Sequence, residues 1–312
     1  MTVAFSRGDP RHYTPDRLPR EFLAYDQTVD HLDTGRPGKV GLLEVTFASD
    51  GITRLVHHFQ QTPLHVFRPL YVDPGRPDLA VVYVLSAGGG VLQGDRYRLD
   101  VVCEEGAAVH LTTQAATKLY RMDRNYASQL LHLTAGPQSF LEYLPDPIIP
   151  YRDARFFQRT LLTIHPTATA ILGETLLPGR VAHGERHAYT HFVGQTETRT
   201  PDGRLLFADT INLAPSSSKL QSPGRLGDHD VLASLFVVSQ VLRPRDLNAR
   251  LRAALDHHPA IAAGASELPN GAGVSVRILG PTSTAVRAAL HATWNEARLA
   301  AIGVPAPNLR KP

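Results

Sequence analysis

The chain has few of the residues that build disulfides and soft metal sites. Its 312 residues include a single cysteine, Cys103, with two methionines and one tryptophan. One thiol cannot form a disulfide within the chain or a multi-cysteine metal site, and such cysteine usage fits a reducing compartment. Cys103 lies on the apolar side of an alternating stretch, so we expect an inert core thiol rather than a nucleophile.

Lysine is also scarce. Only four of the 32 basic residues are lysines, and the formal net charge is +3. The arginines are spread along the chain rather than gathered in one run. This pattern predicts a solvated, arginine-biased surface and argues against a nucleic-acid-binding stretch.

Long apolar runs are absent from the sequence. The first twenty residues have no apolar core of the signal-peptide type, and the longest apolar stretch, 231–242, is short and interrupted. A bilayer core of about 30 Å needs roughly 20 apolar helical residues. We therefore expect a soluble, cytoplasmic protein that does not enter a membrane.

The composition suits a sizeable folded core, because 43% of the residues are hydrophobic and 20% are charged. The first residues are rich in arginine, proline, aspartate and glycine and show no sustained periodicity. We predict a flexible N-terminal arm over 1–38, a single β-rich domain with a helical C-terminal portion over 39–305, and an irregular tail over 306–312.

Most of the central chain has the pattern of short β-strands. Residues 97–103 alternate apolar and polar side chains, residues 109–113 repeat the pattern, and 81–85 form an apolar run typical of a buried strand. A hairpin is predicted where residues 196–200 and 204–207 flank the turn Pro201-Asp202-Gly203. Turn signals recur at a spacing typical of an all-β sandwich, barrel or solenoid, and the pattern alone does not choose among them.

After Asp228 the apolar spacing changes to three and four residues, which is typical of helices. Asp228 or Asp230 could cap the first of them, and Gly303 could end the last. The predicted elements are helices over 231–238, 245–255 and 284–302, and a strand over 274–279.

The common catalytic and nucleotide-binding motifs are absent from the sequence. The glycine-rich stretch 88–95 lacks both the Gly-Lys-Ser/Thr ending of a P-loop and the third glycine of a dinucleotide fingerprint, which favours a tight bulged turn. An all-β hydrolase is the alternative function, and it would need two central carboxyl groups about 5–9.5 Å apart. Its candidates are Glu142, Asp146, Asp153, Glu174 and Glu185.

Three of the 15 histidines, His183, His187 and His191, follow one another at intervals of four. Their apolar and aromatic neighbours favour a strand, on which successive members would lie about 13 Å apart, too far to share one ion. We interpret them as ordinary surface histidines, with transient binding of nickel or another borderline metal as the alternative.

Several motifs, in order, resemble those of the urease accessory protein D family. Residues 88–95 (GGGVLQGD) resemble its Gly-Gly-hydrophobic-x-Gly-Asp turn, and 112–121 (TTQAATKLYR) resemble its T-T-x-x-A-T-K-x-Y-R segment. The similarity covers roughly 41–304. Further matches are 141–145 (LEYLP), Leu172-Gly173-Glu174 followed by Gly179-Arg180, 276–280 (VRILG) and the helix that contains Trp294.

The resemblance implies a mostly β fold, in which many short strands form a superhelical, solenoid-like arrangement with a few C-terminal α-helices. It also implies a chaperone rather than an enzyme. Such a protein acts with the F-type and the GTP-hydrolysing G-type accessory proteins, binds the urease apoprotein and helps to insert nickel into the urease metallocentre. No cofactor would be tightly bound, and nickel would pass transiently, through an internal passage. A stand-alone nickel store is a further alternative, which would require tight stoichiometric binding.

A passage for nickel needs polar groups that bind weakly in succession, because a closed four-ligand site would trap the ion. We expect Asp95, Glu142 and Glu174 to line such a passage or face a partner, with a hydrogen-bonded structural role as the alternative. Lys118 and Arg180 are candidates for partner contacts or internal ion pairs. The remaining motif residues are expected to be structural: Gly89, Gly90, Gly94, Thr117, Pro145 and Gly179.

Overall fold

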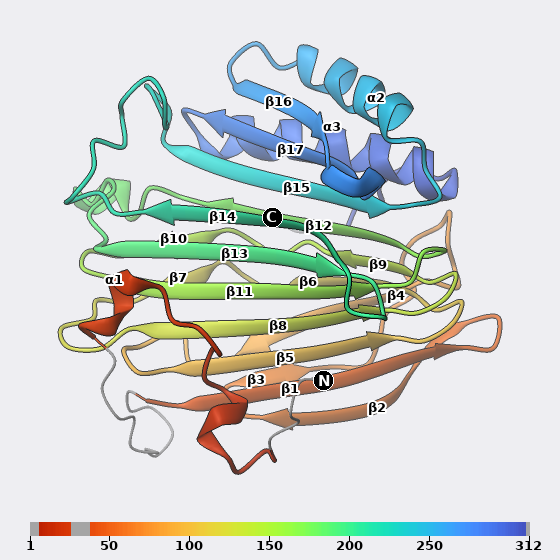
Figure 1. The fold of residues 1–312 in the computed structure, drawn as a ribbon, viewed down its shortest axis with the longest axis horizontal. Coiled ribbons are helices and arrows are strands. Elements are labelled where there is room, and N and C mark those ends of the chain that lie inside the picture. Colours follow the sequence, from red (N-terminus) through yellow and green to blue (C-terminus); the bar gives the residue numbers. More distant parts are fainter. Residues whose placement is uncertain (1–5, 26–37, 310–312) are drawn as a thin grey trace.

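Two stacked β-sheets form the body of the protein (Figure 1). The structure is a computed structural model that describes residues 6–25 and 38–309. Sheet A contains, in spatial order, β14 (Leu205–Leu213), β13 (His191–Arg199), β11 (Arg155–Ile164), β8 (Ala127–Ala135), β5 (Arg96–Cys103), β1 (Val40–Ser49) and β2 (Thr53–Gln61). Sheet B contains β16 (Ala262–Glu267), β17 (Gly273–Gly280), β15 (Val231–Ser239), β12 (Thr169–Leu176), β9 (Phe140–Tyr143), β6 (Ala108–Thr113), β4 (Ala80–Ser86) and β3 (Leu64–Val66).

The connectivity makes these sheets two sides of a β-solenoid. From β5 to β13 the chain alternates between the sheets, and each circuit adds one strand to each sheet in parallel with its predecessor. The short strands β7 (Thr117–Leu119) and β10 (Ile148–Pro150) pair in parallel on a third side. The result is a solenoid of about four turns, which confirms the solenoid-like expectation. Antiparallel strands extend it at both ends.

The largest core fills the space between the two sheets. Alternate residues of each strand point inward, such as Leu43 and Phe47 of β1 and Leu141 of β9. The predicted strands over 81–85, 97–103 and 109–113 are confirmed as β4, β5 and β6, and the predicted hairpin as β13–β14. Cys103 is fully buried in this core, and burial raises the pKa of its thiol, as expected of an inert cysteine.

Two helices cover the other face of sheet B (Figure 1). These are α2 (Pro244–Asp256) and α3 (Ser283–Ile302), and both confirm predicted helices, as β17 confirms the predicted strand before α3. The hydroxyl of Thr282 accepts a hydrogen bond from the amide of Ala285 and caps α3, while Gly303 ends it with a φ of 72°.

The predicted helix over 231–238 is wrong, because this segment is strand β15. It pairs antiparallel with β12 on one side and β17 on the other, and all nine of its residues are buried. Both faces are covered, one by the inter-sheet core and one by α2 and α3, so the strand shows no polar alternation. Asp230 is not a helix cap; its carboxylate instead accepts a hydrogen bond from Arg186 at 2.6 Å.

The described part of the N-terminal arm, residues 6–25, lies on the outer face of sheet A (Figure 1). It contains the 3-10 turn η1 (Pro10–His12) and the short helix α1 (Arg20–Leu23). The side chain of Phe22 is buried against Tyr126 and Phe157. Residues 1–5 and 26–37 of the predicted arm, and 310–312 of the tail, lie outside the described residues, and the division into arm, domain and tail stays a prediction.

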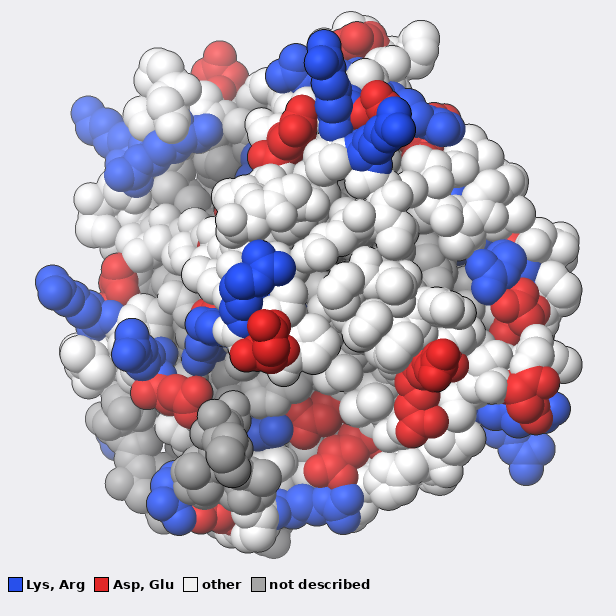
Figure 2. Space-filling model, turned by 45° about the vertical axis from the view of Figure 1, so that its right-hand side comes forward, with Lys and Arg blue, Asp and Glu red and all other residues white. Residues whose placement is uncertain are grey.

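The surface carries charges of both signs. Figure 2 shows basic and acidic side chains interspersed around a broad area of uncharged residues. Within 6–25 and 38–309, no helix combines the length and the apolar character that a membrane crossing requires. Two further 3-10 turns, η2 (Val181–His183) and η3 (Pro269–Gly271), lie in connections between strands.

Candidate functional site

A cavity of ≈ 210 Å³ lies between the two sheets, next to the glycine-rich turn. Side chains alternate between the two faces of a strand, and several neighbouring strands each place one polar side chain in the wall of the cavity. In sheet A, Tyr97, Gln129 and Gln158 are register partners on β5, β8 and β11 and form a polar row. Tyr143 and Glu174 contribute from β9 and β12 of sheet B. The solenoid thus stacks polar groups on top of one another inside an otherwise apolar core.

Two acidic residues, Glu174 and Asp146, line the cavity, and Glu174 comes from the inward face of strand β12. The amide of Gln158 donates a hydrogen bond to Glu174 Oε2. Gly194 leaves room for the carboxylate, because a Cβ at that position would lie only 3.3 Å from Glu174 Oε1. Burial raises the pKa of Glu174 to about 7, although Arg277 opposes this shift. Glu174 is therefore protonated in part of the molecules near neutral pH.

The polar row continues beyond Glu174 along sheet B. Ser234 and Arg277 are its successive register partners on β15 and β17. Arg277 donates to Ser234 Oγ at 2.6 Å and to Asp209 Oδ1 of β14 at 2.8 Å, which links the far ends of both sheets. Polar groups therefore extend from the cavity towards the β14–β17 end of the solenoid.

The glycine-rich turn and the short strand β7 form one side of the cavity. Gly89, Gly90, Thr117, Lys118 and Pro145 all contribute to its wall. The expected positive φ values of this turn are confirmed for two of its glycines, Gly89 at 70° and Gly94 at 79°. Lys118 is exposed, so its ammonium group is available to solvent beside the cavity.

We expect Gly90→Ala to destabilise the protein by about 1–3 kcal/mol through overpacking. A Cβ at Gly90 would lie 2.7 Å from Tyr120 Cε2 and 2.8 Å from the Lys118 carbonyl oxygen. Gly88→Ala is the matched control, because its Cβ would meet nothing closer than 3.5 Å. Urea unfolding of both variants measures the difference, and equal stabilities would contradict the packing explanation.

Asp95 has a structural environment. It is fully buried and accepts hydrogen bonds from the backbone amides of Lys39 and Leu92 and from the Tyr97 hydroxyl, each at 2.9 Å. Burial raises the pKa of Asp95, and these three donors oppose the shift. Its contacts hold the end of the glycine-rich turn against the start of β1.

Glu142 points away from the cavity, towards the helices. Its carboxylate is fully buried and accepts hydrogen bonds from Trp294 Nε1 at 2.6 Å, Arg298 Nη1 at 2.6 Å and His110 Nδ1 at 3.0 Å. Arg298 also contacts the carboxylate of Asp73. Burial opposes ionisation of Glu142, but the hydrogen bond from His110 and the Arg298 charge outweigh it and lower its pKa. This buried charge cluster attaches α3 to sheet B.

Arg180 braces the loop that contains Gly179. Its guanidinium donates to both carboxylate oxygens of Glu185, at 2.6 and 2.8 Å, and lies 4.0 Å from the centre of the Tyr151 ring. Gly179 has a φ of 123°, and a Cβ there would lie 2.6 Å from the Glu185 carbonyl oxygen. Both the positive φ and the close carbonyl oxygen therefore require a glycine at position 179.

The three evenly spaced histidines do not share a strand, so that prediction is wrong. His183 ends η2, His187 lies in a loop with a φ of 50°, and only His191 belongs to β13. His187 Nε2 lies 3.2 Å from Asp230 Oδ1, whereas His191 packs near Phe22 of the arm. The segment turns sharply between 183 and 191, and a spacing rule that assumes regular structure therefore failed.

Of the five carboxylates proposed for a hydrolase, Asp146 and Glu174 line the cavity and the other three lie elsewhere. Glu142 faces the helices and Glu174 faces the cavity, so sheet B lies between them. Glu185 is paired with Arg180, and Asp153 lies in a turn near Arg121. Five polar residues of the row were not predicted from the sequence: Gln129, Gln158, Ser234, Asp209 and Arg277. They could have been recognised in the sequence because each is a polar residue at an inward position of a strand, where the other inward residues are mostly apolar.

The fold and the site define a β-solenoid scaffold with a row of polar side chains in an apolar core and a helical layer fixed by buried charges. The profile of the family described as "UreD urease accessory protein" matches residues 39–312. The chain belongs to the UreD urease accessory protein family.

Relatives support this assignment over almost the whole chain. The chain is 43% identical to the urease accessory protein UreD 2 of Streptomyces griseus, over 91% of this chain and 97% of that protein. It is 38% identical to UreD of Haloarcula marismortui (91% and 95% covered) and 37% identical to UreD 2 of Brucella suis biovar 1 (92% and 96%). Proteins of this family are non-catalytic chaperones involved in assembling the nickel metallocentre of urease, so the hydrolase alternative is set aside.

Proposed function

We propose that the cavity between the sheets is part of an internal passage along which nickel moves towards the urease metallocentre, with Glu174 as a weak ligand. The observation that supports this most directly is the position of the Glu174 carboxyl group on the cavity wall, where Gln158 donates a hydrogen bond to it and burial raises its pKa to about 7. Near neutral pH, such a group exchanges a proton for a divalent cation at little cost and releases the cation readily. That behaviour suits transfer rather than storage.

The other groups around Glu174 support weak binding as well. Gln158, Tyr143 and Gln129 offer neutral oxygens, and Asp146 and Lys118 lie nearer to solvent. Among the described side chains of the cavity wall there is no histidine or cysteine. Nickel prefers nitrogen and sulfur ligands for tight binding, so a few oxygen ligands in a mostly apolar wall would hold it loosely. A stand-alone nickel store is therefore the less favoured alternative.

The proposed partners are the urease apoprotein and the accessory proteins of the F and G types. Family membership supports a role in a urease-related complex. The G-type partner would supply GTP hydrolysis, since this chain has no P-loop sequence. Lys118, beside the cavity, and Arg180, on the neighbouring loop, are the proposed contacts to these proteins. Asp95 and Glu142 are assigned to the support of the scaffold, because both are fully buried, whereas the Arg180 side chain is 37% exposed.

The test is urease activation in cells that co-express urease, its accessory proteins and Glu174→Gln. The change removes the charge and keeps the shape, so we expect urease activity and nickel content to fall by about tenfold or more, the effect of losing one charged contact. Glu267→Gln, on the exposed strand β16, is the control and keeps full activation. Normal activation by Glu174→Gln would refute the passage. Co-purification of urease with the variant would show that the complex still forms and that nickel transfer, rather than docking, is lost.

A further inference from the structure

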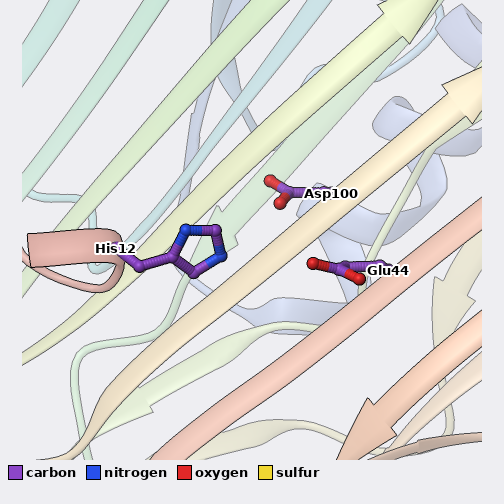
Figure 3. A group of neighbouring side chains, drawn as sticks. All are labelled: His12, Glu44 and Asp100. Carbon is purple, nitrogen blue, oxygen red and sulfur yellow. The ribbon is translucent and has the colours of Figure 1, made fainter. Parts of the chain in front are cut away.

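A second group of metal-binding side chains lies on the outer face of sheet A, away from the cavity. His12 of the N-terminal arm, Glu44 of β1 and Asp100 of β5 each offer one ligand atom, and these atoms lie within 4.8 Å of one another. Figure 3 shows the three side chains converging from three different elements. Glu44 and Asp100 are register partners on neighbouring parallel strands, so backbone pairing holds the two carboxylates side by side.

A second imidazole extends this group. His132 of β8 is the register partner of Asp100, and its Nδ1 lies 3.2 Å from Asp100 Oδ1. The carboxylates of Glu44 and Asp100 are 19% and 22% exposed, and His12 is 7% exposed, so an ion here would be largely shielded from water. One imidazole and two carboxylates, with the His132 imidazole beside Asp100, form a donor set that suits borderline divalent transition metals.

We propose that His12, Glu44 and Asp100, with His132 beside them, bind one divalent transition-metal ion that clamps the N-terminal arm to sheet A. His12 belongs to the arm and the other three residues belong to the sheet, so one ion would join the two. An ion at about 2.0–2.2 Å from each ligand needs ligand atoms about 3–4 Å apart, so the side chains close by about 1 Å. His12 precedes the segment 39–312 that the family profile matches, so the clamp is a property of this chain's arm.

Two arginines neutralise the carboxylates when no ion is bound. Arg7 of the arm contacts Glu44 Oε2, and Arg98 Nε lies 2.8 Å from Asp100 Oδ2. Arg98 also donates to the His12 carbonyl oxygen at 2.8 Å, which keeps the arm in place. The side chain of Arg7 is 46% exposed and is the more readily displaced of the two. An incoming cation therefore competes with Arg7 for Glu44.

Because Arg7 and the ion compete for Glu44, removal of Arg7 should change the affinity for the ion in the opposite direction from removal of His12. Nickel and zinc binding to the full chain is measured separately by titration calorimetry and equilibrium dialysis, with Glu174→Gln in every sample to remove a contribution from the cavity. We expect one ion per chain. His12→Ala weakens its binding by about tenfold or more, whereas Arg7→Ala strengthens it by about two- to fivefold because a competing cation is lost. His58→Ala, on the exposed strand β2, is the control and leaves binding unchanged.

Two outcomes would overturn the proposal: equal ion binding by the parent and His12→Ala, or weaker binding by Arg7→Ala. If His12→Ala does not fold, Glu44→Gln takes its place, because that change alters no apolar contact of the arm. Protection of the arm from a protease gives a second readout. The ion should slow cleavage within residues 6–25 of the parent and not of the variant, and equal cleavage with and without the ion would count against a clamp.

Discussion

Arg298→Met should lower the free energy of unfolding by about 3–5 kcal/mol, because it leaves two buried carboxylates without their cation. The Arg298 side chain is fully buried and pairs with both Asp73 and Glu142, whose side chains are 2% and 0% exposed. Methionine fills much of the same volume, so the loss is electrostatic rather than a cavity effect. Urea unfolding can be followed by the emission of Trp294, the single tryptophan of the chain, which donates to Glu142 within the cluster.

Arg250→Met is the matched control. Arg250 also pairs with a carboxylate of α3, Glu296, but its side chain is 44% exposed, so its removal costs about 1 kcal/mol or less. In the double variant Arg298→Met/Asp73→Asn, part of the stability should return, since one of the two unpaired charges is removed. A cost for Arg298→Met no greater than that for Arg250→Met would show that the cluster contributes little.

Glu174→Gln should stabilise the protein at alkaline pH by up to about 3 kcal/mol. Burial raises the pKa of Glu174 from 4.5 to about 7. A carboxyl group that binds its proton more tightly in the folded state costs no stability below its unfolded pKa, and the cost grows as pH rises towards the folded pKa. Each pKa unit corresponds to about 1.4 kcal/mol. Glutamine does not titrate and avoids this cost.

The measurement is the difference in unfolding free energy between Glu174→Gln and the parent, at about pH 5 and about pH 8. We expect a small difference at the lower pH and the full gain at the higher one. Glu267→Gln, on an exposed strand, should show no such trend. Because the same Glu174→Gln variant should activate urease poorly, a more stable but less active protein would show that the interior carboxylate is kept for transfer. A difference that does not change with pH would exclude the raised pKa.

The sequence was informative where one face of an element meets solvent and uninformative where both faces are buried. Alternation located β5, and the three-to-four spacing with Gly303 located α3. Strand β15 was mistaken for a helix because its two covered faces remove the polar alternation that marks a strand. The solenoid itself was implied by motifs rather than by periodicity, since its parallel pairing depends on contacts between distant segments.

The candidate site was predictable in part. The motifs identified the glycine-rich turn, whose positive φ values follow from its glycines. The resemblance also assigned Glu142 and Glu174 the same predicted role, although Glu142 faces the helices and Glu174 faces the cavity. Periodicity assigns residues to alternate sides of a strand, but it does not say which side meets which layer. That assignment depends on the register between strands, which also brings Glu44 beside Asp100 and Asp100 beside His132.

The span of the buried charge cluster has a consequence for biosynthesis. Asp73 and Arg298 are 225 residues apart in the chain. Strands emerge from the ribosome in order, and the solenoid turns can pair as they appear. The carboxylates of Asp73 and Glu142, however, have no Arg298 to pair with until α3 has been translated. We expect ribosome-bound intermediates to lack the α3 layer and to expose the apolar side of sheet B. We therefore expect the nascent protein to need protection of this apolar surface until α3 has been made and packs on sheet B.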